Sequence, residues 1–259
     1  MLEFISHGAI DLPWWGYVFV ALGLTHITIA SVTIYLHRAV THSALDLHPF
    51  ASHGFRLWLW LTTGMVTKEW VAVHRKHHAK CETEDDPHSP QVKGVWKVVF
   101  AGVLLYVAEA RIRETTEKYG KGTPDDWIER NVYSRLATIG LSITAVADIL
   151  LFGIVPGALI FITQIAWIPF WAAGVINGVG HYFGYRNYEH DREHPNVHAS
   201  RNIPLAPFAW FIGGEELHNN HHANASSAKF SHKWWEFDLG WGYIKILEFL
   251  GLATVKNSS

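Results

Sequence analysis

The stretch Glu69-Trp-Val-Ala-Val-His74-Arg-Lys-His77-His78 places three histidines within five positions, and His218-Asn-Asn-His221-His222 repeats the spacing 144 residues later. Residues at i, i+3 and i+4 of an α-helix share one face, so we expect each triplet to direct its imidazoles into one volume. Converging imidazoles are typical of a metal site. A single string of this kind also fits surface or hydrogen-bonded core histidines, but two matched strings favour a metal centre.

Further histidines lie in two other places. His37 and His42 are five residues apart, roughly 140° around an ideal helix, so they can converge only where a helix ends. His181 closes the string Asn177-Gly-Val-Gly-His181, directly after a long apolar run. Zinc usually takes four ligands and iron up to about six, so nine imidazoles favour two neighbouring ions over one.

The composition excludes several classes of protein. With a net charge of −2, the chain lacks the excess of positive charge that is typical of nucleic-acid-binding proteins. The lone cysteine, Cys81, rules out an internal disulfide framework or a thiolate cluster. The metal chemistry must therefore run on nitrogen and oxygen ligands. Nothing in the composition marks a linker, so we expect residues 1–259 to form a single domain.

Long apolar runs edged by tryptophan predict an all-α integral membrane protein. Residues 14–36 carry no charged side chain and suffice for one span, while residues 136–177 predict a hairpin of two spans with Asp148 near the turn, at the far interface. The shorter runs 55–66 and 94–108 fit interfacial helices or the core of a cap, and residues from 233 onward predict an amphipathic helix on the membrane. This gives about three transmembrane helices, interfacial helices and a cytoplasmic, histidine-rich cap.

The basic residues predict the orientation. No Lys or Arg precedes Arg38, which argues against a secretory signal, whereas many follow the first span. The positive-inside rule then places residues 37–135 in the cytoplasm and the N-terminus outside, and the hairpin returns the chain to the cytoplasm before His181. All four histidine clusters thus lie on one side. We expect a multi-pass protein of a bacterial inner membrane whose active site faces the cytoplasm.

These motifs together resemble the membrane fatty acid desaturase family, nearest its acyl-CoA branch of the stearoyl-CoA Δ9 type. The resemblance rests on His37-Arg-Ala-Val-Thr-His42, His74-Arg-Lys-His-His78 with Glu84-Asp-Asp-Pro-His88, Asn177-Gly-Val-Gly-His181-Tyr-Phe-Gly-Tyr-Arg186, and Gly214-Glu-Glu-Leu-His218-Asn-Asn-His-His222. It covers about residues 14–255. Two departures are that only one span precedes His37, so the first helix of the usual pair is missing, and that no fused haem-binding carrier domain is present.

The resemblance implies a ligand set for two irons, with O2 as co-substrate: His37, His42, His74, His77, His78, His181, His218, His221 and His222, with Asn177 holding a water. It also implies a long acyl substrate, carried by coenzyme A, acyl carrier protein or a phospholipid. Electrons would come from a separate ferredoxin, rubredoxin or small haem protein with its reductase.

Several other residues are candidates for a role at the site because of their chemical type. Glu69, Asp86, Glu215 and Glu216 are candidates to accept hydrogen bonds from ligand N–H groups, with ordinary solvated charge as the alternative. Trp70 is a candidate wall of an acyl tunnel, although an interfacial anchor fits it equally. Basic residues including Arg75 and Lys76 could meet a phosphorylated carrier.

Three activities fit this sequence. The first is O2-dependent desaturation of a fatty acyl chain, at the Δ9 position by resemblance. The second is hydroxylation of an acyl or alkyl chain on the same scaffold, because the ligands do not decide between removal of a second hydrogen and oxygen transfer. The third is a zinc-dependent membrane hydrolase or a metal-handling protein.

Overall fold

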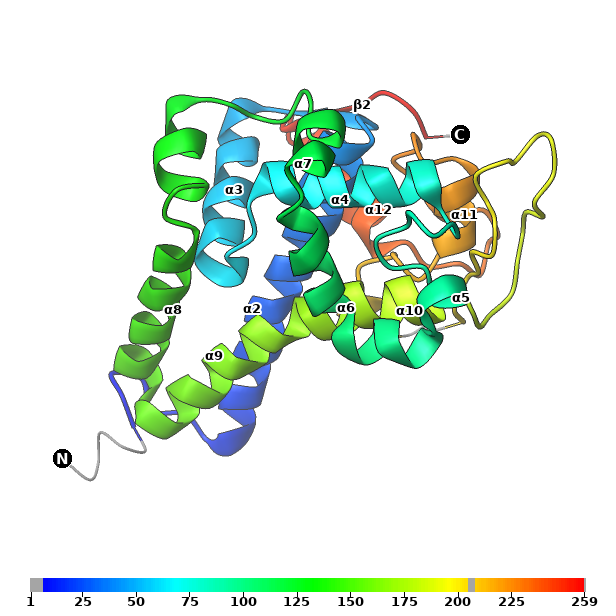
Figure 1. Cartoon of the computed structure of the whole chain (residues 1–259). Coiled ribbons are helices and arrows are strands. Elements are labelled where there is room, and N and C mark those ends of the chain that lie inside the picture. Colours follow the sequence, from blue (N-terminus) through cyan, green and yellow to red (C-terminus); the bar gives the residue numbers. More distant parts are fainter. Residues whose placement is uncertain (1–6, 205–207, 259) are drawn as a thin grey trace.

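The computed structural model describes residues 7–204 and 208–258, and it is almost entirely helical (Figure 1). In chain order the elements are α2 (Trp14–Ser31), η1 (Val32–Thr41), β1 (Leu45–Leu47), α3 (Pro49–Thr63), α4 (Thr67–Lys80), α5 (Pro90–Lys93), α6 (Val95–Ala110), α7 (Arg113–Tyr119), η2 (Glu129–Tyr133), α8 (Ala137–Phe152), α9 (Ile154–Ile168), η3 (Pro169–Ile176), α10 (Asn177–Val179), η4 (Phe208–Phe211), α11 (His218–Ala223), α12 (Leu239–Phe249) and β2 (Ala253–Val255).

Two continuous helices in the described residues are long and apolar enough to cross a membrane by length and composition. They are Trp14–Thr41, which joins α2 to η1, and Ile154–Val179, which joins α9, η3 and α10. The predicted hairpin is present, but its first arm, α8, has only 16 residues and is shorter than such a span. Backbone hydrogen bonds from Ala9 and Ile10 to the last turn of α8 place the start of α2 beside the hairpin turn.

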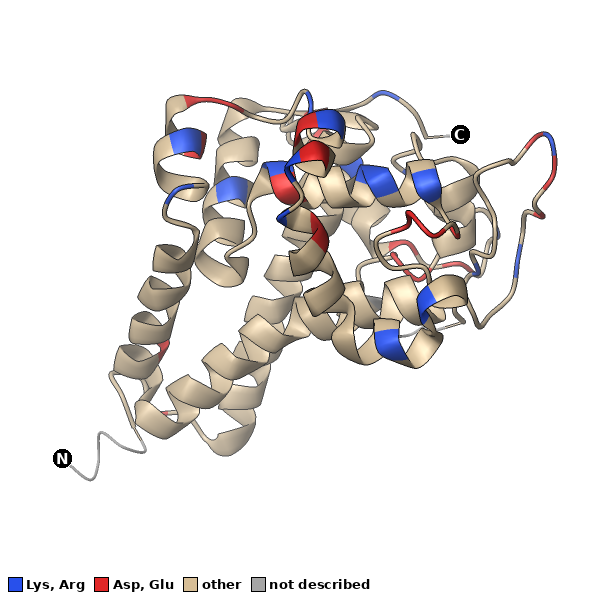
Figure 2. Ribbon diagram, in the orientation of Figure 1, with Lys and Arg blue, Asp and Glu red and all other residues tan. Residues whose placement is uncertain are grey.

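The surface of these helices is apolar. Figure 2 shows that Lys, Arg, Asp and Glu gather in the upper and right-hand parts of the molecule and are nearly absent from the lower lengths of α2, α8 and α9. On α8, one face leaves four large apolar side chains between 47% and 57% exposed: Ile139, Ile143, Val146 and Leu150. An unbroken apolar outer face is what lipid accommodates and water does not.

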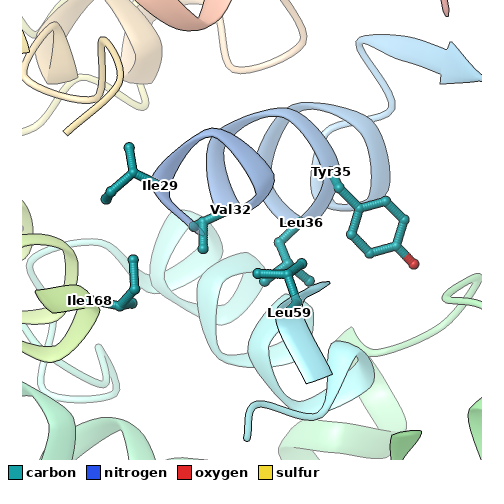
Figure 3. Close-up of a cluster of buried hydrophobic side chains, with 6 residues drawn as sticks. All are labelled: Ile29, Val32, Tyr35, Leu36, Leu59 and Ile168. Carbon is teal, nitrogen blue, oxygen red and sulfur yellow. The ribbon is translucent and has the colours of Figure 1, made fainter. Parts of the chain in front are cut away.

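A buried cluster joins the first long helix to α3 and α9 near the histidines. Ile29, Val32, Tyr35 and Leu36 share one side of the helix and pack against Leu59 and Ile168 (Figure 3). Backbones approach closely elsewhere: an added Cβ at Gly102 of α6 would lie 2.1 Å from the Ala173 carbonyl oxygen of η3, and one at Gly174 would lie 2.3 Å from that of Val99. Glycine is required there because no side chain fits.

A buried ion pair joins the end of the first long helix to the segment that precedes α12. Arg38 is fully buried, lies 2.8 Å from the Asp238 carboxylate, and stacks 3.7 Å above the Phe230 ring. Asp238 also caps the N-terminus of α12. The short strands β1 and β2 pair antiparallel and tie the chain end to the region after His42.

Two expectations of the sequence need correction. Asp148 does not reach an interface: it is buried between the hairpin arms and accepts a 2.7 Å hydrogen bond from Gln164, because a carboxylate inside an apolar pair of helices needs a donor. The helix predicted from residue 233 begins only at Leu239, where Asp238 supplies its cap.

Candidate metal centre

Four segments bring histidines together in one part of the structure. His37 comes from η1, with His42 at its C-terminal end. α4 carries His74, His77 and His78, and α11 carries His218, His221 and His222. His181 follows α10 directly. All nine predicted histidines therefore meet, although 185 residues separate the first from the last.

The nine divide into two adjacent groups. One contains His37, His42, His74, His78 and His221, whose nearest ring nitrogens lie within 4.8 Å of one another. The other contains His77, His181 and His222 by the same criterion. His218 joins that second group through Nε2 distances of 2.8 Å to His181 and 3.2 Å to His222.

Each histidine string supplies both groups, which corrects the expectation that a triplet serves one volume. His74 and His78 are one turn apart on α4 and enter the first group, while His77 enters the second. On α11, His218 and His222 enter the second and His221 the first. Because i and i+4 align better than i and i+3, the helix splits its triplet between two neighbouring volumes.

The approach of His37 and His42 depends on the winding of the chain. Residues 32–41 form a π-helix, whose hydrogen bonds join residues five apart, and the His42 amide bonds the His37 carbonyl at 3.1 Å. Their ring centroids are 5.0 Å apart. The expectation that they converge at a helix end is confirmed, since His42 caps η1.

The outer nitrogens of several of these rings contact oxygen atoms. His77 Nδ1 lies 3.0 Å from Asp86, His37 Nδ1 2.7 Å from Glu215, and His181 Nδ1 2.9 Å from Glu82. His222 Nδ1 donates to the Asn196 carbonyl at 3.0 Å. An oxygen at Nδ1 favours the tautomer with its proton there and leaves the Nε2 lone pair directed inward.

The electrostatics fit a cation between the rings. Burial, followed by the neighbouring imidazoles, lowers the pKa of His74 and His78 well below its usual value, and the same holds for His218 and His221. These four rings are therefore neutral, and inward Nε2 lone pairs only 3.0 Å apart, as in His74 with His78, repel one another. Ligands about 2.1 Å from one ion and at right angles lie about 3.0 Å apart. The residues present thus fit metal ions.

The carboxylates divide into two kinds. Burial alone would raise the pKa of Asp86 and Glu215, but contact with His77 and His37, respectively, holds both pKa values below their usual range. Glu82, which the sequence did not single out, is the third acid in contact with a ring. Glu69 and Glu216 contact none of the nine histidines, contrary to expectation. Glu216 is buried, and burial raises its pKa to about 8.

Two further residues stand beside the second group. His88 is buried and stacks on His77 with centroids 4.4 Å apart; its position in Asp86-Pro-His88 was the only signal in the sequence. Cys81 lies within 4.8 Å of ring nitrogens of His77, His181 and His222. Burial, then Asp86 and Glu82, raises the pKa of its thiol well above the usual value.

A cavity of about 410 Å³ leads to this centre. Most of its wall is apolar and comes from α3, α4, α6, α9 and η3, and it ends at His37, His74, His218 and Asn177. Trp70 lines it and stacks on His74 at 5.1 Å. The basic residues expected near a carrier are used otherwise: Arg75 donates to backbone carbonyls and Lys76 pairs with Glu109.

Comparison with known proteins points to one family. Residues 12–245 match fatty acid desaturases. The chain is 30% identical over 250 residues to an sn-1 stearoyl-lipid 9-desaturase of Anabaena variabilis, covering 93% of this chain and 84% of that protein. It is 28% identical to Delta-9 acyl-lipid desaturase 1 of Arabidopsis thaliana, covering 93% and 75%, and 29% identical to Acyl-CoA 5-desaturase AL21 of Anemone leveillei, covering 90% and 70%. The chain therefore belongs to the fatty acid desaturase family and is an oxidoreductase.

Proposed function

We propose that this protein is a membrane-bound, O2-dependent desaturase of long acyl chains that works with two irons. The observation that carries the proposal is the position of two groups of imidazoles beside an apolar cavity. Five imidazoles in the first group exceed the four ligands that zinc usually takes, and imidazole is a common ligand of iron. This argues against a zinc hydrolase.

The proposed ligands of one iron are His37, His42, His74, His78 and His221, and those of the other are His77, His181, His218 and His222. Bound irons would supply the two-electron chemistry that lets O2 oxidise an unactivated methylene. Overall, two adjacent methylenes lose one hydrogen each, and these two hydrogens combine with O2, two external electrons and two protons to give two waters. The electrons come from a separate carrier protein.

The residues of the chain orient the imidazole rings, position the acyl chain and exclude water from the cavity. Asp86, Glu215 and Glu82 hold three rings in the orientation that directs Nε2 inward. Trp70, stacked on His74, forms the wall that places an acyl chain beside the first group. Asn177 lines the cavity one turn before His181, where its carboxamide can hold a water on the second iron.

The proposed location is a bacterial inner membrane, crossed by α2 with η1, by α8 and by α9 with η3, with the cap in the cytoplasm. The apolar outer face of α8 supports this, as does the row Trp96, Phe100 and Leu104 on α6, which is 64% to 75% exposed. That row fits a helix lying partly in lipid. The Δ9 position is proposed from the relatives alone.

The test combines metal analysis with product analysis. Protein purified without added metal should hold close to two irons, and cells that express it should convert labelled stearate into a monounsaturated product that has lost two hydrogens. His77→Ala should abolish the product, whereas His53→Ala, at an exposed position outside both groups, should not. Zinc without iron would exclude the proposal, and a product that has gained one oxygen atom would identify a hydroxylase.

A further inference from the structure

Two polar groups interrupt the apolar wall of the cavity. α6 and its C-cap residue line the cavity with Val103, Tyr106, Val107, Ala110 and Arg111. The last four lie three, four, seven and eight residues after Val103, so all five share one face of the helix. α4 faces this row with Glu69 and Trp70. Tyr106 and Glu69 lie close enough for the Glu69 charge to raise the pKa of the Tyr106 hydroxyl, an effect that adds to burial, the larger cause.

Neither group has a partner within the described part of the chain. The Tyr106 hydroxyl oxygen is buried and lacks any hydrogen-bond partner there. Glu69 makes no hydrogen bond or ion pair with the described residues, and burial raises the pKa of its carboxyl. Buried polar groups in native proteins are nearly always satisfied, so the Tyr106 hydroxyl, with the half-buried Glu69 carboxyl in the facing cavity wall, indicates a polar ligand group.

The ends of the cavity give it a direction. Arg111, at the end of the α6 row, is exposed, whereas His37 and His218 at the metal centre are 1% to 2% exposed. On α4, Glu69 precedes His74 by five residues, about 7.5 Å along the helix axis. A chain that enters at Arg111 therefore passes Tyr106 and Glu69 before it reaches the histidines.

We propose that Tyr106 and Glu69 form a seat for the ester or thioester group of the acyl substrate, in which the Tyr106 hydroxyl donates a hydrogen bond to the carbonyl oxygen. The seat rests on the proposed function, and it would determine which carbon of the acyl chain is oxidised. Because the carbonyl is fixed at one point of α4 and α6, the carbon that lies beside the histidines is fixed by its distance from the carbonyl. Neither residue is a metal ligand, so the seat binds substrate without metal.

Binding to metal-free protein tests the seat. Two probes of equal chain length are compared, methyl stearate, which has the carbonyl, and octadecane, which lacks it. Loss of one hydrogen bond should weaken methyl stearate binding to Tyr106→Phe about fivefold to tenfold and leave octadecane binding unchanged. Tyr119→Phe, which removes a hydroxyl outside the cavity, is the control. Equal weakening of both probes would show a packing defect and overturn the seat.

Product analysis of the iron-loaded enzyme gives the second readout. Tyr106→Phe should raise KM with little change in kcat and spread the double bond over neighbouring positions, and Glu69→Leu should do the same, while Glu69→Gln, which keeps a donor, restores a single position. Stearoyl-phosphatidylglycerol and stearoyl-CoA, offered separately, decide whether the seat takes an ester or a thioester. An unchanged KM and a single product position in Tyr106→Phe would overturn the proposal. If native protein forms no double bond but still distinguishes the two probes, the desaturase function fails and the seat stands.

Discussion

Glu82 and Asp86 belong to one loop that contacts the second group of histidines. The backbone of Glu82 is left-handed, with φ of 59°, and its carboxylate lies against His181, a ring that arrives from the far end of the hairpin. Asp86 faces His77 from the same loop and also accepts hydrogen bonds from the Glu82 and His88 amides. One short loop therefore lies against two rings of the second group, with Asp86 hydrogen-bonded to His77 and Glu82 2.9 Å from His181.

Replacing these carboxylates should loosen the metal before it harms the fold. Asp86→Asn and Glu82→Gln keep size but remove the negative acceptor at Nδ1, so the affinity for iron should fall about 10-fold to 100-fold. The measurement is the iron retained against a graded series of chelator concentrations. Asp85→Asn, an exposed acid of the same loop, is the matched control and should retain iron as the native protein does. Equal retention by all three variants would contradict the role of the loop.

Sequence spacing located the rings but not the groups that hold them. Six of the nine histidines were identifiable because helix periodicity places i, i+3 and i+4 near one face, whereas His37, His42 and His181 were added from their places at the ends of apolar runs. Glu82, His88 and Asn196 lie in irregular segments, where no period relates sequence position to direction. Glu69, on α4, and Glu216, in a turn, were candidates on chemical type alone, and neither contacts one of the nine rings.

At the scale of elements, two π-helical segments precede ligand positions. η1 runs into His42 and η3 into Asn177. Each lets a helix cross the apolar layer and then rotate its last turn toward the centre. A period of 3.6 residues cannot reveal this change of winding, so the predicted first span, residues 14–36, ends before the last turns of the helix Trp14–Thr41.

The crossing of α6 and η3 should be the most sensitive helix contact. In Gly102→Ala the new methyl would meet the Ala173 carbonyl at 2.1 Å, so the helices must separate, and we expect a loss of about 1–3 kcal/mol. Gly54→Ala, inside α3 with nothing within 4 Å, should instead gain about 0.5–1 kcal/mol from helix propensity. Thermal unfolding midpoints in detergent compare the two. A midpoint for Gly102→Ala equal to that of Gly54→Ala would show that the crossing tolerates separation.

At the scale of the whole molecule, the two ends of the bundle differ in chemistry. The start of α2 and the α8–α9 turn are joined by backbone hydrogen bonds at one end, and the histidines and most of the charge lie at the other (Figures 1 and 2). Composition sufficed to predict this polarity. It did not show which short helices cross, because α8 with 16 residues and α6 with 16 residues have similar lengths and differ in their partners.

Cysteine labelling in intact cells tests the orientation of the whole molecule. Asp11, exposed and beside the hairpin turn, should lie outside, and Asp191, in the exposed loop that follows the last span, should lie in the cytoplasm. In a Cys81→Ser background, a membrane-impermeant thiol reagent should label Asp11→Cys in whole cells, and Asp191→Cys only after lysis. The buried Cys81 should react little in either case. Labelling of both positions from outside would place the metal centre on the outer face of the membrane, where cytoplasmic electron carriers cannot reach it, and would exclude the proposed supply of electrons.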